Sequence, residues 1–100
     1  MSTNLNPYIT VIVATKNVNQ TIINLLNSLK MQTSKDFELI IIDSVSTDGT
    51  LKTIKKNRDI ISQLVVEKDK GISDAWNKGI MISKGEWILF LGGDDFLYSN

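Results

Sequence analysis

Four short apolar runs alternate with three helical patterns along this chain, and this alternation constrains the fold more than any other feature. The runs are rich in Ile, Val and Leu and predict strands at residues 9–14, 37–42, 64–67 and 87–91, with the third starting as early as Ile60. Strands that alternate with helices indicate βαβ units around a mostly parallel sheet. Their nearly continuous apolar content predicts strands covered on both faces. The expected fold class is α/β, in the order β-α-β-α-β-α-β.

Helical spacing predicts the first two helices. Apolar side chains at positions 22, 25, 26 and 29 indicate an amphipathic helix over residues 19–31. The second helix is expected to open at residues 46–49, where a hydroxyl caps free backbone N–H groups. Asp48 is then expected in its first turn, where the helix dipole favours a negative charge.

The third helix is expected to begin at residues 73–74 and to end at Gly85, which is a typical C-cap residue. It is predicted to bury Trp76 and Ile80, with Gly79 allowing a close approach to the sheet. The sequence has no internal repeat and no linker, so residues 1–100 are expected to form a single unit.

Composition excludes several kinds of chemistry. Eleven Lys and Arg balance eleven Asp and Glu, which argues against an extended basic surface for nucleic acid. His and Cys are absent, so thiols, imidazole bases and the usual zinc sites are excluded within these 100 residues, and any metal that they bind must be held by oxygen. No signal-like segment opens the chain, and its apolar runs are far shorter than the ~20 residues of a membrane span. The expected compartment is the cytoplasm, with peripheral attachment to the inner face of the membrane left open.

Polar residues follow every predicted strand. In an open α/β sheet, ligands gather outside the carboxyl ends of the strands. Strand ends also need turn-forming and capping residues, but three acidic ends together favour a ligand site. Two adjacent carboxylates after Gly92 and Gly93 suit Mg²⁺ or Mn²⁺ and a phosphorylated ligand, because glycines let the backbone approach closely. The residues that follow the strands are Thr15-Lys16-Asn17, Asp43-Ser44, Asp69-Lys70-Gly71 and Asp94-Asp95.

Two common nucleotide-binding motifs are missing from the sequence. No Gly-rich loop ends in Gly-Lys-Ser/Thr, and no G-x-G-x-x-G follows the first strand, so neither a P-loop nucleoside-triphosphatase nor a dinucleotide-binding domain is supported. The first strand ends in Thr15 and not in a carboxylate, which weighs against phospho-acceptor domains and phosphatases.

Eight short blocks, in this order and spacing, resemble family 2 inverting glycosyltransferases, whose nucleotide-sugar-binding half has the fold called GT-A. The blocks are ITVIVATKN (9–17), QT (32–33), FELIIID (37–43), STDGT (46–50), DKG (69–71), AWN (75–77), GE (85–86) and FLGGDD (90–95). Residues 69–79 are most similar to a subgroup that builds bacterial capsular or exopolysaccharide. The resemblance implies that residues 1–100 are a Rossmann-like N-terminal nucleotide-sugar-binding part, without the acceptor-binding half.

The resemblance also implies roles for individual residues. Thr15 and Asn17 fall in the family's nucleoside-binding loop, where Lys16 and Asn17 supply no aromatic face for the base. Asp43 matches the aspartate that accepts a hydrogen bond from the base, which is compatible with uracil and makes a UDP-sugar the leading donor. The implied nucleotide-sugar-binding residues are Thr15, Asn17, Asp43, Asp69, Lys70, Gly71 and Asp94.

Asp94 matches the final carboxylate of the family's D-x-D metal motif, and Asp95 is the acidic residue beside it. Gly92 occupies the position of the first carboxylate. Both aspartates are therefore expected to hold Mn²⁺ or Mg²⁺, which would neutralise charge on the departing nucleoside diphosphate. Asp48 is interpreted as a helix-start residue.

The implied function is transfer of a sugar from a nucleoside-diphosphate sugar to a growing bacterial polysaccharide or lipid-linked acceptor, by a metal-assisted inverting mechanism. The family's general base lies beyond the metal motif, so no residue here is assigned as catalytic and the fragment alone is expected to be inactive. One alternative is a catalytically silent nucleotide-binding or scaffold domain. A second is a diguanylate cyclase, because residues 92–96 resemble its G-G-[DE]-[DE]-F signature.

Overall fold

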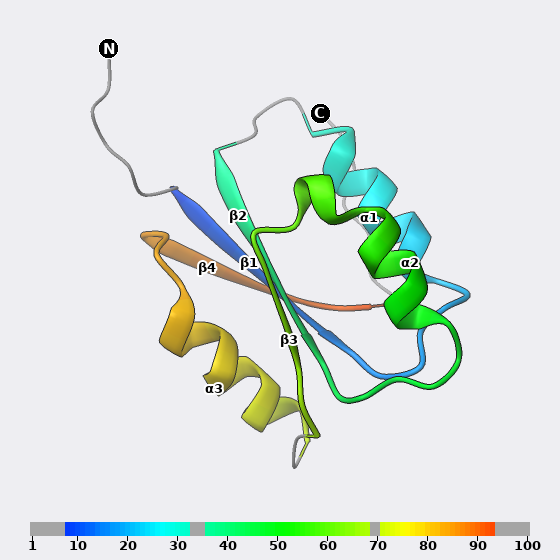
Figure 1. The fold of residues 1–100 in the computed structure, drawn as a ribbon. Coiled ribbons are helices and arrows are strands. Elements are labelled where there is room, and N and C mark those ends of the chain that lie inside the picture. Colours follow the sequence, from blue (N-terminus) through cyan, green and yellow to red (C-terminus); the bar gives the residue numbers. More distant parts are fainter. Residues whose placement is uncertain (1–7, 33–35, 69–70, 94–100) are drawn as a thin grey trace.

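The computed structural model describes residues 8–32, 36–68 and 71–93. Four strands form one parallel sheet in the order β3-β2-β1-β4. Helices α1 and α2 cover one face and α3 covers the other (Figure 1). The α/β class expected from the sequence is confirmed. The elements are β1 (Ile9–Thr15), α1 (Ile22–Lys30), β2 (Phe37–Asp43), α2 (Thr50–Lys56), a 3₁₀ turn (Arg58–Ile60), β3 (Gln63–Val66), α3 (Ile72–Ile82) and β4 (Trp87–Gly92).

Strand β2 is buried on both of its faces. Successive side chains of a strand point to opposite sides of the sheet. Leu39 and Ile41 therefore pack under α1 and α2, whereas Ile40 and Ile42 pack under α3, and all four are fully buried. The prediction of strands covered on both faces is confirmed for this strand.

Helix α1 is shorter at both ends than the expected 19–31, although its predicted apolar stripe at positions 22, 25, 26 and 29 is buried. The residues before it make contacts with other loops instead. The backbone N–H of Asn19 donates to Asp48 Oδ2 at 3.0 Å, and Thr21 Oγ1 donates to the carbonyl of Gly93 at 3.1 Å. These contacts explain why the helix begins only at Ile22.

The expected start of α2 is corrected by the structure. The Ser46 hydroxyl does not cap the helix, because it donates to Asp43 Oδ1 at 2.6 Å. Asp48 precedes the helix, separated from it by Gly49, and its Oδ1 accepts from the backbone N–H of Thr50 at 3.0 Å. The carboxylate of Asp48, and not the hydroxyl of Ser46, therefore accepts a hydrogen bond from a free backbone N–H at the start of α2.

Helix α3 ends before Gly85, which is not its C-cap as expected. The residue after the helix, Ser83, already has extended backbone. Gly85 lies against β1, because its N–H donates to Thr10 Oγ1 at 2.8 Å and a Cβ there would lie 2.6 Å from the Thr10 nitrogen. Thr10 in turn donates to the buried Glu38 at 2.7 Å, so this glycine fixes the turn between α3 and β4 to the sheet.

The buried side of α3 differs in part from the prediction. Gly79 allows the expected close approach, since a Cβ there would lie 2.5 Å from Ile12 Cγ2. Trp76 is half-buried, and its ring centroid lies 4.8 Å from that of Phe90. Ile80 is 42% exposed, so its predicted burial is wrong.

The two edge strands also depart from expectation. β3 begins at Gln63 and ends at Val66, and Ile60 belongs to the preceding 3₁₀ turn. β4 was expected to be covered on both faces, yet Trp87 is 62% exposed and Phe90 41%. The strand pairs with β1 on one side only. Within the described part of the chain, no helix has the length and apolar character needed to cross a membrane.

Candidate functional site

The carboxyl ends of β1, β2 and β4 meet at one edge of the sheet. The parallel register sets Thr15 opposite Asp43 and Ala14 opposite Gly92. The chain runs from β1 to β2 and β3 on one side, whereas β4 lies on the other side of β1. In open α/β sheets, ligands bind where the strand order reverses in this way. The candidate site is therefore the edge formed by the loops after β1, β2 and β4.

Asp43 is the centre of this edge and is fully buried. Its Oδ1 accepts from Thr15 Oγ1 and from Ser46 Oγ, each at 2.6 Å, and its Oδ2 accepts from the backbone N–H of Ser46 at 2.7 Å. A carboxylate offers about four acceptor positions. Three of them are thus occupied from within the chain, and Asp43 holds the loops after β1 and β2 together.

The same two loops are joined by further hydrogen bonds. The backbone N–H of Asn17 donates to Ser46 Oγ at 2.9 Å, and that of Thr47 donates to Asn17 Oδ1 at 2.8 Å. The N–H of Val18 donates to Thr50 Oγ1 at 2.9 Å. Asn17 has a left-handed backbone (φ 52°), which asparagine tolerates better than most residues. The structure therefore brings Thr15, Asn17 and Asp43 together, as expected.

Lys16 contacts the loop after β2 through its ammonium group. Its Nζ donates to the carbonyl of Ser44 at 2.9 Å and lies 3.5 Å from that of Val45. Val45 has a left-handed backbone, with φ 53°. Lys16 therefore places a positive charge on the exposed side of this edge while it fixes the backbone of the neighbouring loop.

Gly93 brings the end of β4 against the loop after β1. Its N–H donates to the carbonyl of Ala14 at 3.2 Å, and its own carbonyl accepts from Thr21 Oγ1. A Cβ at this position would lie 2.5 Å from Val18 Cγ2, so the approach requires a glycine. The end of β4 thus lies directly beside the loop after β1.

Four of the residues expected at this site lie outside the described residues. Gly71 is described: it is exposed, has φ +127° and directly precedes α3. Among the residues whose placement is described, no three acidic side chains gather in a way that could hold a metal ion. The four residues outside are Asp69, Lys70, Asp94 and Asp95.

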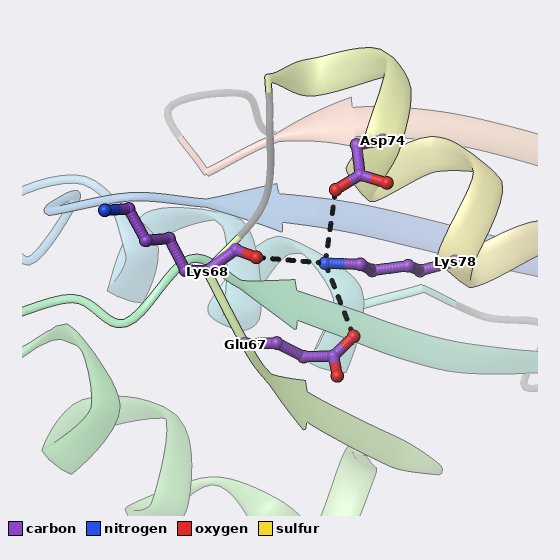
Figure 2. A network of polar contacts seen from close by, with 4 residues as sticks. All are labelled: Glu67, Lys68, Asp74 and Lys78. Carbon is purple, nitrogen blue, oxygen red and sulfur yellow. Dashed lines mark hydrogen bonds and ion pairs between the residues drawn. The ribbon is translucent and has the colours of Figure 1, made fainter.

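A small ionic network fixes the start of α3 to the end of β3 (Figure 2). Lys78 Nζ lies 3.3 Å from Glu67 Oε1, 3.3 Å from Asp74 Oδ2 and 3.4 Å from the carbonyl of Lys68. Partial desolvation favours the neutral amine, but the carboxylates of Asp74 and Glu67 outweigh it and raise the pKa of Lys78 above its ordinary value. One cation therefore bridges the two elements that flank residues 69 and 70.

Asp48 is held ionised at the start of α2. The Thr50 hydroxyl donates to its Oδ1 at 2.5 Å, and this hydrogen bond, with those from the backbone of Asn19 and Thr50, holds the pKa of Asp48 below its ordinary value. Asp48 therefore accepts a hydrogen bond at the start of α2 from a position before the helix, and not from within its first turn as expected.

A separate hollow lies at the opposite edge of the sheet, near the start of β2 and the end of α1. It measures about 350 Å³, and most of its lining is apolar. Among the described residues of the lining, Asp59 is the one charged side chain, and they lack the clustered polar groups of the carboxyl edge. Its lining residues are Leu29, Phe37, Asp59, Ile60, Ile61 and Ser62.

Sequence reasoning missed three contributors to this edge. Ser46 was interpreted as part of a helix cap, although a serine three residues after an aspartate can also close a turn with it. Lys16 is expected among the polar residues at the strand ends but without this contact, and no role is expected for Val45. No local signal predicts that Lys16 reaches the carbonyls of the next loop, because that contact depends on the pairing of β1 with β2.

The sequence profile of glycosyl transferase family 2 matches residues 10–100. An Escherichia coli relative, the UDP-Glc:alpha-D-GlcNAc-diphosphoundecaprenol beta-1,3-glucosyltransferase WfaP, is 37% identical over 91 residues. That match covers 88% of this chain and 36% of the relative.

Two solved structures share the fold. TarS of S. aureus in complex with UDP-GlcNAc is 33% identical with a TM-score of 0.81, over 89% of this chain and 27% of that one. The mannosyltransferase PcManGT of Pyrobaculum calidifontis, in complex with GDP-Man and Mn²⁺, is 28% identical with a TM-score of 0.81, over 93% and 29%. The chain thus spans about a third of the length of the proteins it matches.

Proposed function

We infer that this chain, which belongs to glycosyl transferase family 2, binds a nucleoside-diphosphate sugar at the carboxyl edge of its sheet. The protein would transfer the sugar to a bacterial polysaccharide or a lipid-linked acceptor. The observation that carries the proposal is the pair of loops joined around Asp43, beside the close approach of Gly93 to β1. The donors named for the relatives, UDP-Glc, UDP-GlcNAc and GDP-Man, support this ligand class.

Asp43 is the proposed acceptor for an N–H of the base. Thr15 and Ser46 now cover its oxygens, so we expect this contact to form when the Ser46 side chain turns away. Asn17 and Gly71 are also proposed to contribute to the donor site at this edge. The positive charge of Lys16 suits a phosphorylated ligand. Asp69 and Lys70 complete the proposed donor site.

Asp94 and Asp95 are the residues that would hold a divalent cation, Mn²⁺ or Mg²⁺. Carboxylate oxygens are the ligands these ions prefer. When bound, the ion would neutralise charge on the departing nucleoside diphosphate. We propose an inverting transfer whose general base lies outside residues 1–100, so that these residues alone bind donor without turning it over. A cytoplasmic, membrane-peripheral location stays a prediction, and cell fractionation tests it.

Titration calorimetry tests the proposal with UDP, GDP and GTP, each with and without Mn²⁺. We expect a nucleoside diphosphate to bind, and Mn²⁺ to strengthen that binding. Preference for GTP would favour the cyclase, and absence of binding would favour the scaffold domain.

Substitutions then locate the site. Asp43→Asn should weaken UDP binding by roughly tenfold, because a hydrogen bond to a charged acceptor is worth about 1.5–3 kcal/mol. Asp59→Asn, an exposed acidic residue at the opposite edge, serves as the matched control and should leave the affinity unchanged. Asp94→Asn with Asp95→Asn should abolish the effect of Mn²⁺ while the metal-free affinity persists. A retained Mn²⁺ effect in that double variant would reject the proposed metal ligands.

A further inference from the structure

Val45, two residues beyond the end of β2, has a left-handed backbone with φ 53°. A β-branched side chain is unfavourable there, because its Cβ crowds the following carbonyl oxygen. The other residues with positive φ in the described part of the chain are Asn17, Gly49 and Gly71, which are types that tolerate this conformation. Backbone geometry therefore does not explain why a valine stands at this position.

The strained conformation is held in place by both neighbours of Val45. The carbonyl of Ser44 accepts from Lys16 Nζ at 2.9 Å. The N–H of Ser46 donates to Asp43 Oδ2 at 2.7 Å, and the hydroxyl of Ser46 donates to the same carboxylate. Because these bonds fix the backbone on each side, the loop cannot relax to a more favourable φ without losing them.

The Val45 side chain contributes little to the packing of the core. It is 45% exposed and belongs to neither of the two buried apolar clusters. Residues 16–21 and 44–49 contain no aromatic side chain, and their only other apolar residue, Val18, packs against the core. Val45 is thus the exposed apolar side chain of the two loops that meet at Asp43.

We propose that Val45 makes the apolar contact with the base of the bound nucleotide and helps to determine donor specificity. The inference rests on the proposed function. Strain of this kind persists at ligand-binding sites, where it has a use in the bound state. Val45 lies two residues from Asp43, so one loop would supply both a polar and an apolar contact to the base.

The test compares Val45→Asn and Val45→Gly with the wild type, in the protein at its natural length. Both variants should bind UDP and UMP roughly fivefold more weakly, because the base loses an apolar contact. An equal loss for the two ligands assigns the contact to the nucleoside end, since they differ only in phosphate. The thermal midpoint should stay the same or rise, because asparagine and glycine accept a positive φ.

Met31→Asn is the matched control. Met31 is 67% exposed and follows α1 at the opposite edge, so this substitution should leave the affinity for UDP unchanged. Wild-type affinity in both Val45 variants would overturn the inference, and so would a lower affinity accompanied by a lower thermal midpoint. Failure of the wild type to bind either UDP or GDP would instead reject the proposed function, and the inference with it.

Discussion

The two faces of the sheet are built differently, although β2 contributes fully buried side chains to both. Helices α1 and α2 lie side by side over one face and enclose a continuous buried cluster (Figure 1). On the other face, α3 covers a smaller buried cluster that contains Ile12, Ile40 and Ile42. The edge strand β4 is exposed on both of its faces, with Trp87 on the side of α1 and Phe90 on the side of α3. Among the described residues, the larger buried apolar cluster thus lies on the side of α1 and α2. Most of the stability from apolar burial should therefore come from the side of α1 and α2.

The largest expected effect compares neighbouring residues of β2 that face opposite ways. Ile41→Ala should cost about 4 kcal/mol of unfolding free energy, because the surrounding cluster is closed and a cavity remains. Ile40→Ala should cost about 2–3 kcal/mol, since the thinner layer under α3 collapses more easily. Both side chains are fully buried, so exposure does not separate them. Urea unfolding measures the difference, and equal losses would contradict the comparison.

A second test concerns the contact between α3 and β1. Gly79→Ala should destabilise the protein by about 1–2 kcal/mol, because the new methyl group meets Ile12 and the helix propensity of alanine offsets only part of the strain. The double variant with Ile12→Ala provides the control. Its destabilisation should be smaller than the sum of the two single losses, as expected for residues in contact. Additive losses in urea unfolding would show that α3 is not tightly seated on this face.

A smaller effect is expected from the ionic network that fixes α3 to β3. Lys78→Met should lower the thermal midpoint by about 2 °C at neutral pH, because exposed ion pairs contribute little. The pKa of Lys78 is raised on folding, so its contribution should be full below the ordinary lysine pKa and disappear as the pH rises through the raised value. Thermal unfolding of both proteins at several pH values checks this. A difference that persists at high pH would exclude the ionic explanation.

The smallest effect on stability is expected at the exposed strand. Trp87→Lys should change the unfolding free energy by less than about 0.5 kcal/mol, because the side chain is 62% exposed. The same substitution should reduce self-association, since charged residues protect an unpaired strand edge. Sedimentation velocity measures association, with Lys84→Met as a control that removes a charge from an exposed position near the same edge. A large loss of stability in Trp87→Lys would show that this face is better packed than its exposure indicates.

The sequence predicted β1 and β2 to within one residue, because a continuous run of Ile, Val and Leu defines a buried strand by itself. The bounds of β4 were predicted equally well, but the same pattern wrongly indicated a strand covered on both faces, because β4 lies at the edge of the sheet. Burial of a strand depends on its neighbours in the sheet, and local pattern does not contain that information.

At the candidate site, the polar strand ends brought Thr15 and Asp43 into the prediction. Their direct contact follows from the β1–β2 register, which a single sequence does not reveal. The bond from Lys16 to the next loop and the left-handed conformation of Val45 depend on the same pairing. The positions of the polar site residues at strand ends were thus predictable, whereas their hydrogen-bond partners were not.

The pairing of β1 with β4 joins segments that lie far apart in the sequence. The Thr21–Gly93 hydrogen bond joins residues 72 positions apart, and contacts of such separation form slowly because a long loop must close first. During synthesis, β1 and β2 can pair, and Thr15 can reach Asp43, before the ribosome has added β4. Gly93, at the end of β4, is added only afterwards. A ligand that contacts both the loop after β1 and the end of β4 would therefore bind and stabilise the completed sheet, but it would not bind the nascent chain.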